Sequence, residues 1–164
     1  MDAGRNKAIL WMVAVLVLAG IAAFMLTRKP AAPQATFTTL DGKKIALDSL
    51  RGKVVLVNFW ATSCPGCIHE MPALMNTYRK FQARGFETVA VAMSYDPLEY
   101  VRQFSEKNQL PFTVALDKDG SAAQAFGARV TPTTFLIDKQ GQIAQRIVGE
   151  PDFAKLHALI EQTL

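Results

Sequence analysis

Two cysteines separated by two residues are the groups in this sequence best suited to chemistry. The segment Cys64-Pro65-Gly66-Cys67 follows an apolar run at 54–60 and opens a stretch with helical periodicity. No other cysteine occurs among the 164 residues. A pair with this spacing, placed where a strand turns into a helix, is typical of a thiol–disulfide exchange site.

The order of the two thiols along the helix predicts different roles for them. A thiol at a helix N-terminus lies beside unpaired backbone N–H groups and the positive end of the helix dipole, which both favour a thiolate. Because the thiolate is the attacking species, we expect Cys64 to be the nucleophile. Cys67, one turn further, is expected to be more buried and to resolve the mixed disulfide. Pro65 and Gly66 help to set the turn, since proline is tolerated in a first helical turn.

Three other uses of the cysteine pair compete with thiol–disulfide exchange. A purely structural disulfide would close a very short loop and would remove little entropy from the unfolded chain. A zinc site needs about four ligands, and beyond the thiols the sequence offers only His69, His157 and carboxylates. Copper binding stays open, because soft thiolates suit Cu(I). We expect no resident metal, and no cofactor other than a redox-active Cys64–Cys67 disulfide.

The N-terminal part of the sequence predicts a membrane anchor. Residues 8–26 form a run of nineteen residues without a charge. At about 1.5 Å per residue, such a helix approaches the roughly 30 Å of a bilayer core. Basic residues flank the run on both sides, but an anchor followed by one globular domain usually exports the domain, so we expect residues 1–7 to be cytoplasmic. A cleaved signal peptide is the alternative, because small residues occur near position 22.

The rest of the chain predicts a linker at 27–35 and one domain at 36–164. Prolines in the linker favour extended backbone. The net charge is +4, and no basic run or aromatic-interleaved basic patch follows the membrane flank. Nucleic-acid binding is therefore not expected.

Hydrophobic periodicity and turn residues predict an α/β domain with a mixed sheet. Strands are expected at 37–40, 44–47, 53–59, 87–93, 112–116, 133–137 and 143–148, and helices at 64–84, 97–108, 120–126 and 151–164. The first two strands and the last two strands should form hairpins. Pro72 should kink the helix that contains it. The cysteine pair then lies at the carboxyl end of a central strand, where open α/β sheets place their sites.

Three segments carry a resemblance to a known family. They are 58–67 with the sequence NFWATSCPGC, 70–72 with EMP, and 127–135 with GARVTPTTF. Together they resemble the thioredoxin superfamily, and more narrowly the TlpA/ResA/CcmG group of membrane-anchored bacterial thiol–disulfide oxidoreductases. The resemblance implies a thioredoxin-like fold with an extra N-terminal β-hairpin and one N-terminal transmembrane helix. It also implies a single-pass protein of the bacterial inner membrane, with the catalytic domain on the periplasmic side.

The resemblance also implies where a substrate docks. In the family, a loop with a cis proline faces the cysteine pair and binds the partner's backbone beside its disulfide. We therefore expect a cis Thr131-Pro132 bond; a trans proline that merely starts a strand is the alternative. The residues expected to form the substrate surface are Trp60, Pro65, Gly66, Val130, Thr131 and Pro132. Trp60 is expected to pack beside the site rather than to react.

Two departures from the family pattern affect the predicted site. Thioredoxin has a buried carboxylate on the strand before the cysteines, where this chain has Asn58; Ser63 replaces a common tryptophan. Glu70 is a candidate for the missing proton-handling role, because a nearby carboxylate raises thiol pKa values and can relay a proton. The alternative for Glu70 is a solvated position on the helix surface. His69 either tunes the thiolate or is simply exposed.

The resemblance predicts a protein-disulfide oxidoreductase that reduces specific disulfides of exported proteins. Its clients in the family are cysteines of apocytochrome c or of copper centres, and a membrane protein supplies the electrons. The same chemistry in the oxidising or isomerising direction is an alternative, because spacing does not fix the reduction potential. A copper chaperone is a non-enzymatic alternative. A peroxidase is disfavoured, because Ala61 stands where peroxiredoxins have threonine.

Overall fold

The computed structural model describes residues 11–13, 15–21 and 29–164, and the chain divides into two units, 1–30 and 31–164. In the first unit, residues 11–13 and 15–21 are helical, and their large apolar side chains are exposed: Trp11 by 74%, Val15 by 59% and Leu18 by 66%. Among the described residues, no helix has the length and apolar character needed to cross a membrane. Part of the predicted 8–26 anchor and all of 1–7 lie outside the described residues, so both stay predictions.

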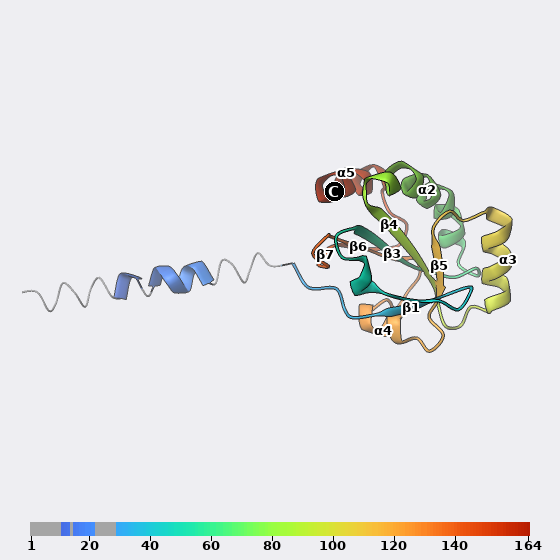
Figure 1. The fold of residues 1–164 in the computed structure, drawn as a ribbon, viewed down its shortest axis with the longest axis horizontal. Helices are drawn as coiled ribbons and strands as arrows, with labels where there is room; N and C mark the ends of the chain where they lie inside the picture. The colour runs from blue at the N-terminus through green and yellow to red at the C-terminus, as the bar shows by residue number, and fades with distance from the viewer. Residues whose placement is uncertain (1–10, 14, 22–28) are drawn as a thin grey trace, which may run out of the picture. The chain divides into compact units, whose positions relative to one another are not determined.

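The second unit is built on one seven-stranded mixed sheet (Figure 1), with the strand order β2-β1-β5-β4-β3-β6-β7. The strands are β1 Thr36–Thr39, β2 Lys44–Ala46, β3 Val54–Trp60, β4 Phe86–Ala92, β5 Thr113–Leu116, β6 Thr133–Ile137 and β7 Ile143–Val148. β3 pairs in parallel with β4, and β4 with β5; the other neighbours are antiparallel. The predicted mixed sheet and both predicted hairpins are confirmed.

Helices cover both faces of this sheet. They are α2 Pro65–Phe81, α3 Leu98–Asn108, α4 Ser121–Phe126 and α5 Phe153–Thr163, with short 3₁₀ turns η1 Leu47–Leu50 and η2 Gln82–Arg84. Apolar residues of α2, α3 and α5 pack together on one face, and those of α4 and η1 pack on the other. This is the thioredoxin-like α/β architecture that the sequence predicted.

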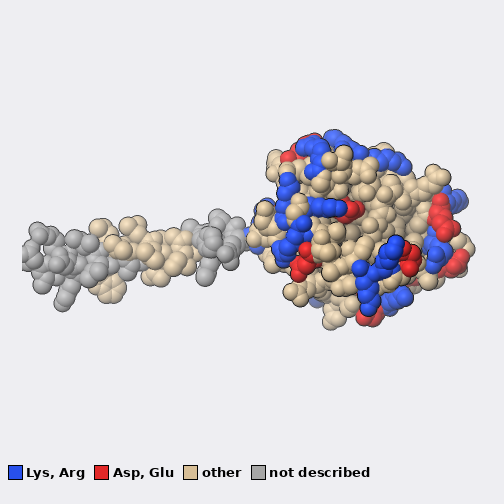
Figure 2. All heavy atoms as spheres, in the orientation of Figure 1, with Lys and Arg blue, Asp and Glu red and all other residues tan. Residues whose placement is uncertain are grey.

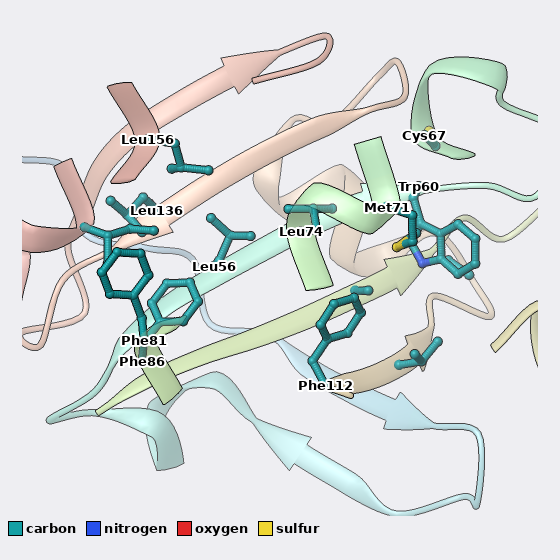
Figure 3. Packing of buried hydrophobic residues seen from close by; sticks show 14 of the residues in the cluster. Leu56, Trp60, Cys67, Met71, Leu74, Phe81, Phe86, Phe112, Leu136 and Leu156 are labelled. Atoms are coloured by element: carbon teal, nitrogen blue, oxygen red, sulfur yellow. The ribbon is translucent and has the colours of Figure 1, made fainter. Parts of the chain in front are cut away.

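β3 lies inside the sheet, between β4 and β6, and every one of its residues is buried. Val54 and Leu56 face the α2 side, whereas Val55 and Val57 face the α4 side, as expected for a strand covered on both faces. Figure 3 shows Leu56, Leu74, Phe81, Phe86, Leu136 and Leu156 packed between the sheet and the helices above it. The core thus fixes β3 rigidly, and with it the turn that follows.

Several boundaries differ from the predicted ones for local reasons. α5 begins at Phe153 because the Asp152 carboxylate accepts hydrogen bonds from the two backbone N–H groups of Ala154 and Lys155. Pro97 is the N-cap of α3 rather than its first helical residue. Pro72 does not end α2, which continues through it to Phe81.

The folded unit also includes residues that the sequence assigned to the linker. Ala31 forms a β-bridge with Gln142, and the Ala32 N–H donates to the carbonyl oxygen of Gly141 at 2.9 Å. These contacts attach the chain to the β6–β7 turn before β1 begins. The linker prediction of 27–35 is therefore too long at its C-terminal end.

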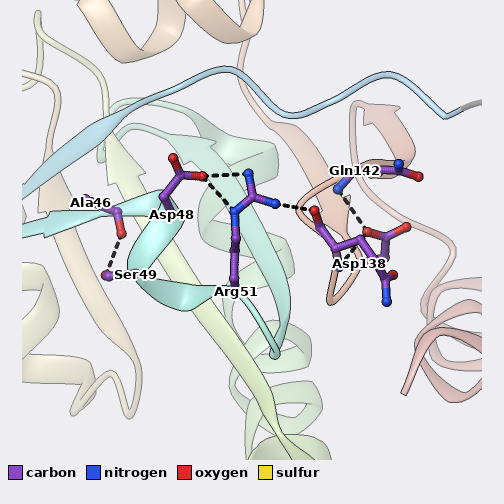
Figure 4. A network of polar contacts seen from close by, with 7 residues as sticks. Ala46, Asp48, Ser49, Arg51, Asp138 and Gln142 are labelled. Atoms are coloured by element: carbon purple, nitrogen blue, oxygen red, sulfur yellow. Dashed lines mark hydrogen bonds and ion pairs between the residues drawn. The ribbon is translucent and has the colours of Figure 1, made fainter.

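A polar network lies at the amino end of β3 (Figure 4). Arg51 pairs with Asp48 at 2.9 Å and donates to the carbonyl oxygen of Gln140. Asp138 accepts from the backbone N–H groups of Gln140 at 3.1 Å and Gln142 at 2.9 Å. This Arg51 network joins η1 to the β6–β7 turn.

Candidate redox site

The cysteine pair is held by the turn from β3 into α2. Two hydrogen bonds fix the chain just before the pair: the N–H and the hydroxyl of Thr62 each donate to the Asp96 carboxylate at 2.6 Å. Asp96 is buried, with 6% of its surface exposed, and it follows β4 at the same edge of the sheet. The Cys64 N–H then donates to Ala61 at 3.1 Å. The turn that holds Cys64 is thus fixed by contacts with the segments that follow β3 and β4.

The two cysteines form a disulfide across the first turn of α2, with their Cα atoms 5.3 Å apart. Cys64 is the N-cap of the helix, and its sulfur accepts a hydrogen bond from the Cys67 N–H at 3.2 Å. Cys64 is partly exposed, whereas Cys67 is fully buried. The geometry therefore gives Cys64 the accessible, helix-stabilised position and places Cys67 behind it, as predicted.

The loop before β6 lies against this turn. The Thr131-Pro132 peptide bond is cis, which confirms the prediction. Pro132 Cδ lies 3.7 Å from the point that a side-chain Cβ on Gly66 would occupy. Pro132 is buried, and its carbonyl oxygen accepts from the Gly149 N–H at 2.9 Å. Val130, 55% exposed, presents an apolar side chain next to this loop.

Glu70 is buried behind the disulfide, with only 2% of its surface exposed. This burial rules out the solvated-helix alternative. The Asn58 amide donates to Glu70 Oε1 at 2.8 Å and to the Thr134 hydroxyl at 2.9 Å. Asn58 and Thr134 are paired across β3 and β6, so the sheet register sets this contact. Glu70 Oε2 and Asn58 Oδ1 have no hydrogen-bond partner among the described residues.

Burial makes this carboxyl a weaker acid than an exposed glutamate. Burial raises the pKa of Glu70 from its ordinary 4.5 to about 7, although the hydrogen bond from Asn58 acts in the opposite direction. The negative charge of Glu150 raises the pKa further. A carboxyl that is about half ionised at neutral pH can both accept and donate a proton there.

The structure brings most of the predicted residues together but changes the part assigned to Trp60. Its side chain is 0% exposed and packs against Phe104, with ring centroids 5.3 Å apart. The prediction that Trp60 contributes to the substrate surface is therefore wrong, because the ring lies in the core. Trp60 packs in the same buried cluster as Cys67, beside the site, as expected.

Two contacts at the site were missed by the sequence analysis. His69 is exposed on α2, and its Nδ1 lies 2.7 Å from Oε2 of Glu150, in the segment after β7. Asp96 anchors the turn, as described above. No sequence signal joins residues 69 and 150. Asp96, however, follows a buried strand at the carboxyl edge of the sheet, and the same edge rule that located the cysteines could have found it.

Across the described parts of the chain, no three His, Cys, Asp or Glu side chains are grouped as metal ligands would be. On the face of the folded unit drawn in Figure 2, basic and acidic side chains lie among one another. The groups able to react at this site are the two sulfurs and the buried Glu70 carboxyl.

Comparisons with known proteins agree with this geometry. The family model described as Redoxin matches residues 28–160. The thiol-disulfide oxidoreductase ResA of Bacillus cereus is 32% identical over 169 residues, which cover 96% of this chain and 97% of ResA. Among solved structures, a Neisseria meningitidis protein described as a thioredoxin has a TM-score of 0.77 and 44% identity, covering 83% of this chain and 91% of that one. A thioredoxin-family thiol:disulfide interchange protein from Chlorobium tepidum has a TM-score of 0.74 and 29% identity, covering 84% and 97%.

Proposed function

This chain belongs to the Redoxin family and is a protein-disulfide oxidoreductase of the thioredoxin superfamily, similar to ResA and CcmG, and we propose that it works as a reductant of specific disulfides in exported proteins. One observation carries the proposed direction: the buried carboxyl of Glu70 lies on the same helix, three residues after Cys67. Residues three apart are neighbours on a helix face. A carboxylate there disfavours a thiolate, so it destabilises the reduced form and lowers the reduction potential.

In the first step, the Cys64 thiolate attacks one sulfur of the substrate disulfide. A bond forms between Cys64 Sγ and that sulfur, the substrate's own S–S bond breaks, and the other substrate sulfur leaves as a thiolate. The partial exposure of Cys64 and its N-cap position support this assignment.

In the second step, Cys67 resolves the mixed disulfide. The Glu70 carboxylate takes the proton of the Cys67 thiol, and the resulting thiolate attacks Cys64 Sγ. The Cys64–Cys67 disulfide forms, and the second substrate sulfur leaves as a thiolate that is then protonated. The substrate has gained two electrons, and a dithiol reductant must return two electrons to the pair before the next cycle.

Substrate docking is assigned to the surface around the disulfide. Its members are Pro65, Gly66, Val130, Thr131 and Pro132, of which Pro65 and Val130 are exposed. Pro132 is buried, so it would act through the backbone and the shape of the loop. The resemblance supports cysteines of apocytochrome c or of copper centres as clients, and a membrane protein as the electron donor.

The proposed location is the bacterial inner membrane, with residues 1–7 in the cytoplasm, a single span at 8–26 and the catalytic domain on the periplasmic side. The uncharged run supports this, as do the exposed apolar side chains of Trp11 and Leu18. A cysteine-reactive, membrane-impermeant reagent applied to intact cells should label reduced Cys64. Labelling only after cell lysis would contradict the proposed orientation.

The reduction potential of the Cys64–Cys67 couple tests the proposed direction. The full chain is equilibrated with defined thiol buffers, and the fraction of disulfide is measured. A value near or below about −220 mV supports a dedicated reductant. A value between about −150 and −120 mV would show an oxidant or isomerase instead.

A further inference from the structure

A second acidic side chain lies over the turn that holds the cysteines. The Glu150 Oε1 atom is 3.1 Å from the position that a Cβ on Gly66 would occupy, and Pro132 is close to the same position. The missing side chain of Gly66 thus leaves room for a carboxylate between the cysteine turn and the cis-proline loop. Substitution of Gly66 by a larger residue would displace Glu150.

The same carboxylate is tied to α2 by a histidine. His69 Nδ1 lies 2.7 Å from Glu150 Oε2, and Glu150 raises the pKa of His69 by this hydrogen bond and by its charge. The side chains of His69 and Glu150 are 80% and 44% exposed, so the pair contributes little to stability. A function in stability alone therefore does not explain its place beside the disulfide.

The charge that Glu70 experiences comes from this pair. The hydrogen-bond partner of Glu70 is the neutral amide of Asn58. Glu150 lies over Gly66, and Gly66 and Glu70 are four residues apart on one face of α2. The charged group that acts on Glu70 is Glu150. The charged group that acts on His69 is also Glu150. The sulfurs, joined in a disulfide, carry no charge in the oxidised protein. Glu150 is thus electrostatically linked both to the buried carboxyl and to an exposed histidine.

We propose that Glu150 is a positioning residue for the proton of Glu70, and that His69 controls its strength by neutralising it. While His69 is protonated, the pair has no net charge and acts weakly on Glu70. When His69 loses its proton, the negative charge of Glu150 is no longer compensated and holds the proton on Glu70 more firmly. The inference rests on the proposed acid–base role of Glu70, and it makes proton transfer at the site respond to pH near neutrality.

Opposite shifts in two variants test the inference. The titration of the Glu70 carboxyl carbon is followed by NMR in the oxidised full chain, in wild type, Glu150→Gln and His69→Asn. Asparagine keeps an N–H donor near the position of Nδ1 but carries no charge. We expect a downward shift of the Glu70 pKa in Glu150→Gln and an upward shift in His69→Asn. The double variant should resemble Glu150→Gln, because His69 acts through Glu150.

The matched control is Glu161→Gln. Glu161 is 42% exposed and pairs with Arg84 at 2.6 Å, so it resembles Glu150 in exposure and pairing but belongs to a different ion pair. It should leave the Glu70 titration unchanged. The Glu150→Gln shift should also shrink between about 0.01 M and 1 M salt, since the screening length falls from about 30 Å to 3 Å.

Shifts that are absent, of the same sign in both variants, or equally large in Glu161→Gln would overturn the inference. Because the readout is a pKa in the oxidised protein, it does not depend on the direction of electron transfer. A reduction potential in the oxidant range would overturn the proposed function and leave this result intact. In the exchange assay, the limb of the pH–rate profile that belongs to Glu70 should move to lower pH in Glu150→Gln.

Discussion

The two ends of β3 are built from similar polar groups but differ in how completely those groups are hydrogen-bonded. At the amino end, the Arg51 network pairs Arg51 with Asp48 and with Gln140, and Asp138 accepts two backbone hydrogen bonds. At the carboxyl end, Asn58, Trp60 and Glu70 each retain a buried polar atom without a partner; in the described chain, the only other such atom belongs to Thr88. Three of these four atoms therefore belong to the carboxyl half of β3 or to the Glu70 side chain that is hydrogen-bonded to it.

This difference separates a structural end from a reactive end. An unpaired buried polar atom costs about 1–3 kcal/mol, so a fold does not gather several of them at one site without compensation. At this end, burial raises the Glu70 pKa to about 7, and the single hydrogen bond from Asn58 does not offset that rise. Asp96 is a useful contrast at the same end, because both of its oxygens accept from Thr62 and it holds the turn in place.

The largest effect is expected from the two cysteines. Cys64→Ser should lower disulfide exchange by at least about 10³-fold, because the nucleophile is lost. Cys67→Ser should instead accumulate the mixed disulfide between Cys64 and a substrate, because nothing resolves it. Non-reducing gels after reaction with a disulfide-bonded model protein measure both outcomes. Equal trapping by the two variants would contradict the assignment of nucleophile and resolving residue.

Substitution of Glu70 should separate activity from stability. Glu70→Gln keeps the acceptor for Asn58 but removes the titrating group, so exchange should slow by about 10²-fold at neutral pH. The folded protein holds the Glu70 proton more tightly than the unfolded chain does, because its pKa is raised from 4.5 to about 7. The contribution of Glu70 to wild-type stability is therefore expected to fall as pH rises from 4.5 to 7, by on the order of 3 kcal/mol.

The glutamine variant lacks this loss, so its advantage in unfolding free energy should grow across that pH window and stay constant above it. Urea unfolding of the oxidised protein at pH 4.5 and pH 8 measures the difference. Burial also lowers the pKa of His157, on α5, but this residue is present in both proteins, so its contribution cancels in the comparison. A pH-independent difference between wild type and Glu70→Gln would show that the raised pKa is absent.

Much of the fold and of the site at the carboxyl end of β3 could be predicted from the sequence. The remaining contacts could not, for a physical reason. The continuous apolar run of β3, the cysteine spacing and the turn residues act locally, so they predicted the mixed sheet, the hairpins and the disulfide. Trp60 was misplaced because an aromatic residue next to a site looks the same in sequence whether it faces the core or the substrate. The contact of residue 69 with residue 150 depends on tertiary packing, which no local pattern encodes. Asp96 could have been located from its place after a buried strand at the carboxyl edge of the sheet.

A smaller effect is expected at Asp96. Asp96→Ala removes both carboxylate oxygens, so both hydrogen bonds from Thr62 are lost and its backbone N–H is left without this acceptor. We expect a loss of about 2 kcal/mol in unfolding free energy and about tenfold slower exchange, because the cysteine turn is less well positioned. Thr62→Val removes only the hydroxyl bond and should cost about 1 kcal/mol. A slower rate with unchanged stability would instead assign Asp96 a direct part in the chemistry.

The smallest effect is expected at the amino end of β3, where Arg51→Ala removes the centre of the Arg51 network. Arg51 and Asp48 are each 55% exposed, and exposed ion pairs contribute about 0–1 kcal/mol. Unfolding free energy should fall by no more than that, and the exchange rate and its pH profile should not change. Asp48→Asn provides the matched partner for a double-mutant cycle. A change in exchange rate would mean that the two ends of β3 are coupled through the strand, and the division into a structural end and a reactive end would fail.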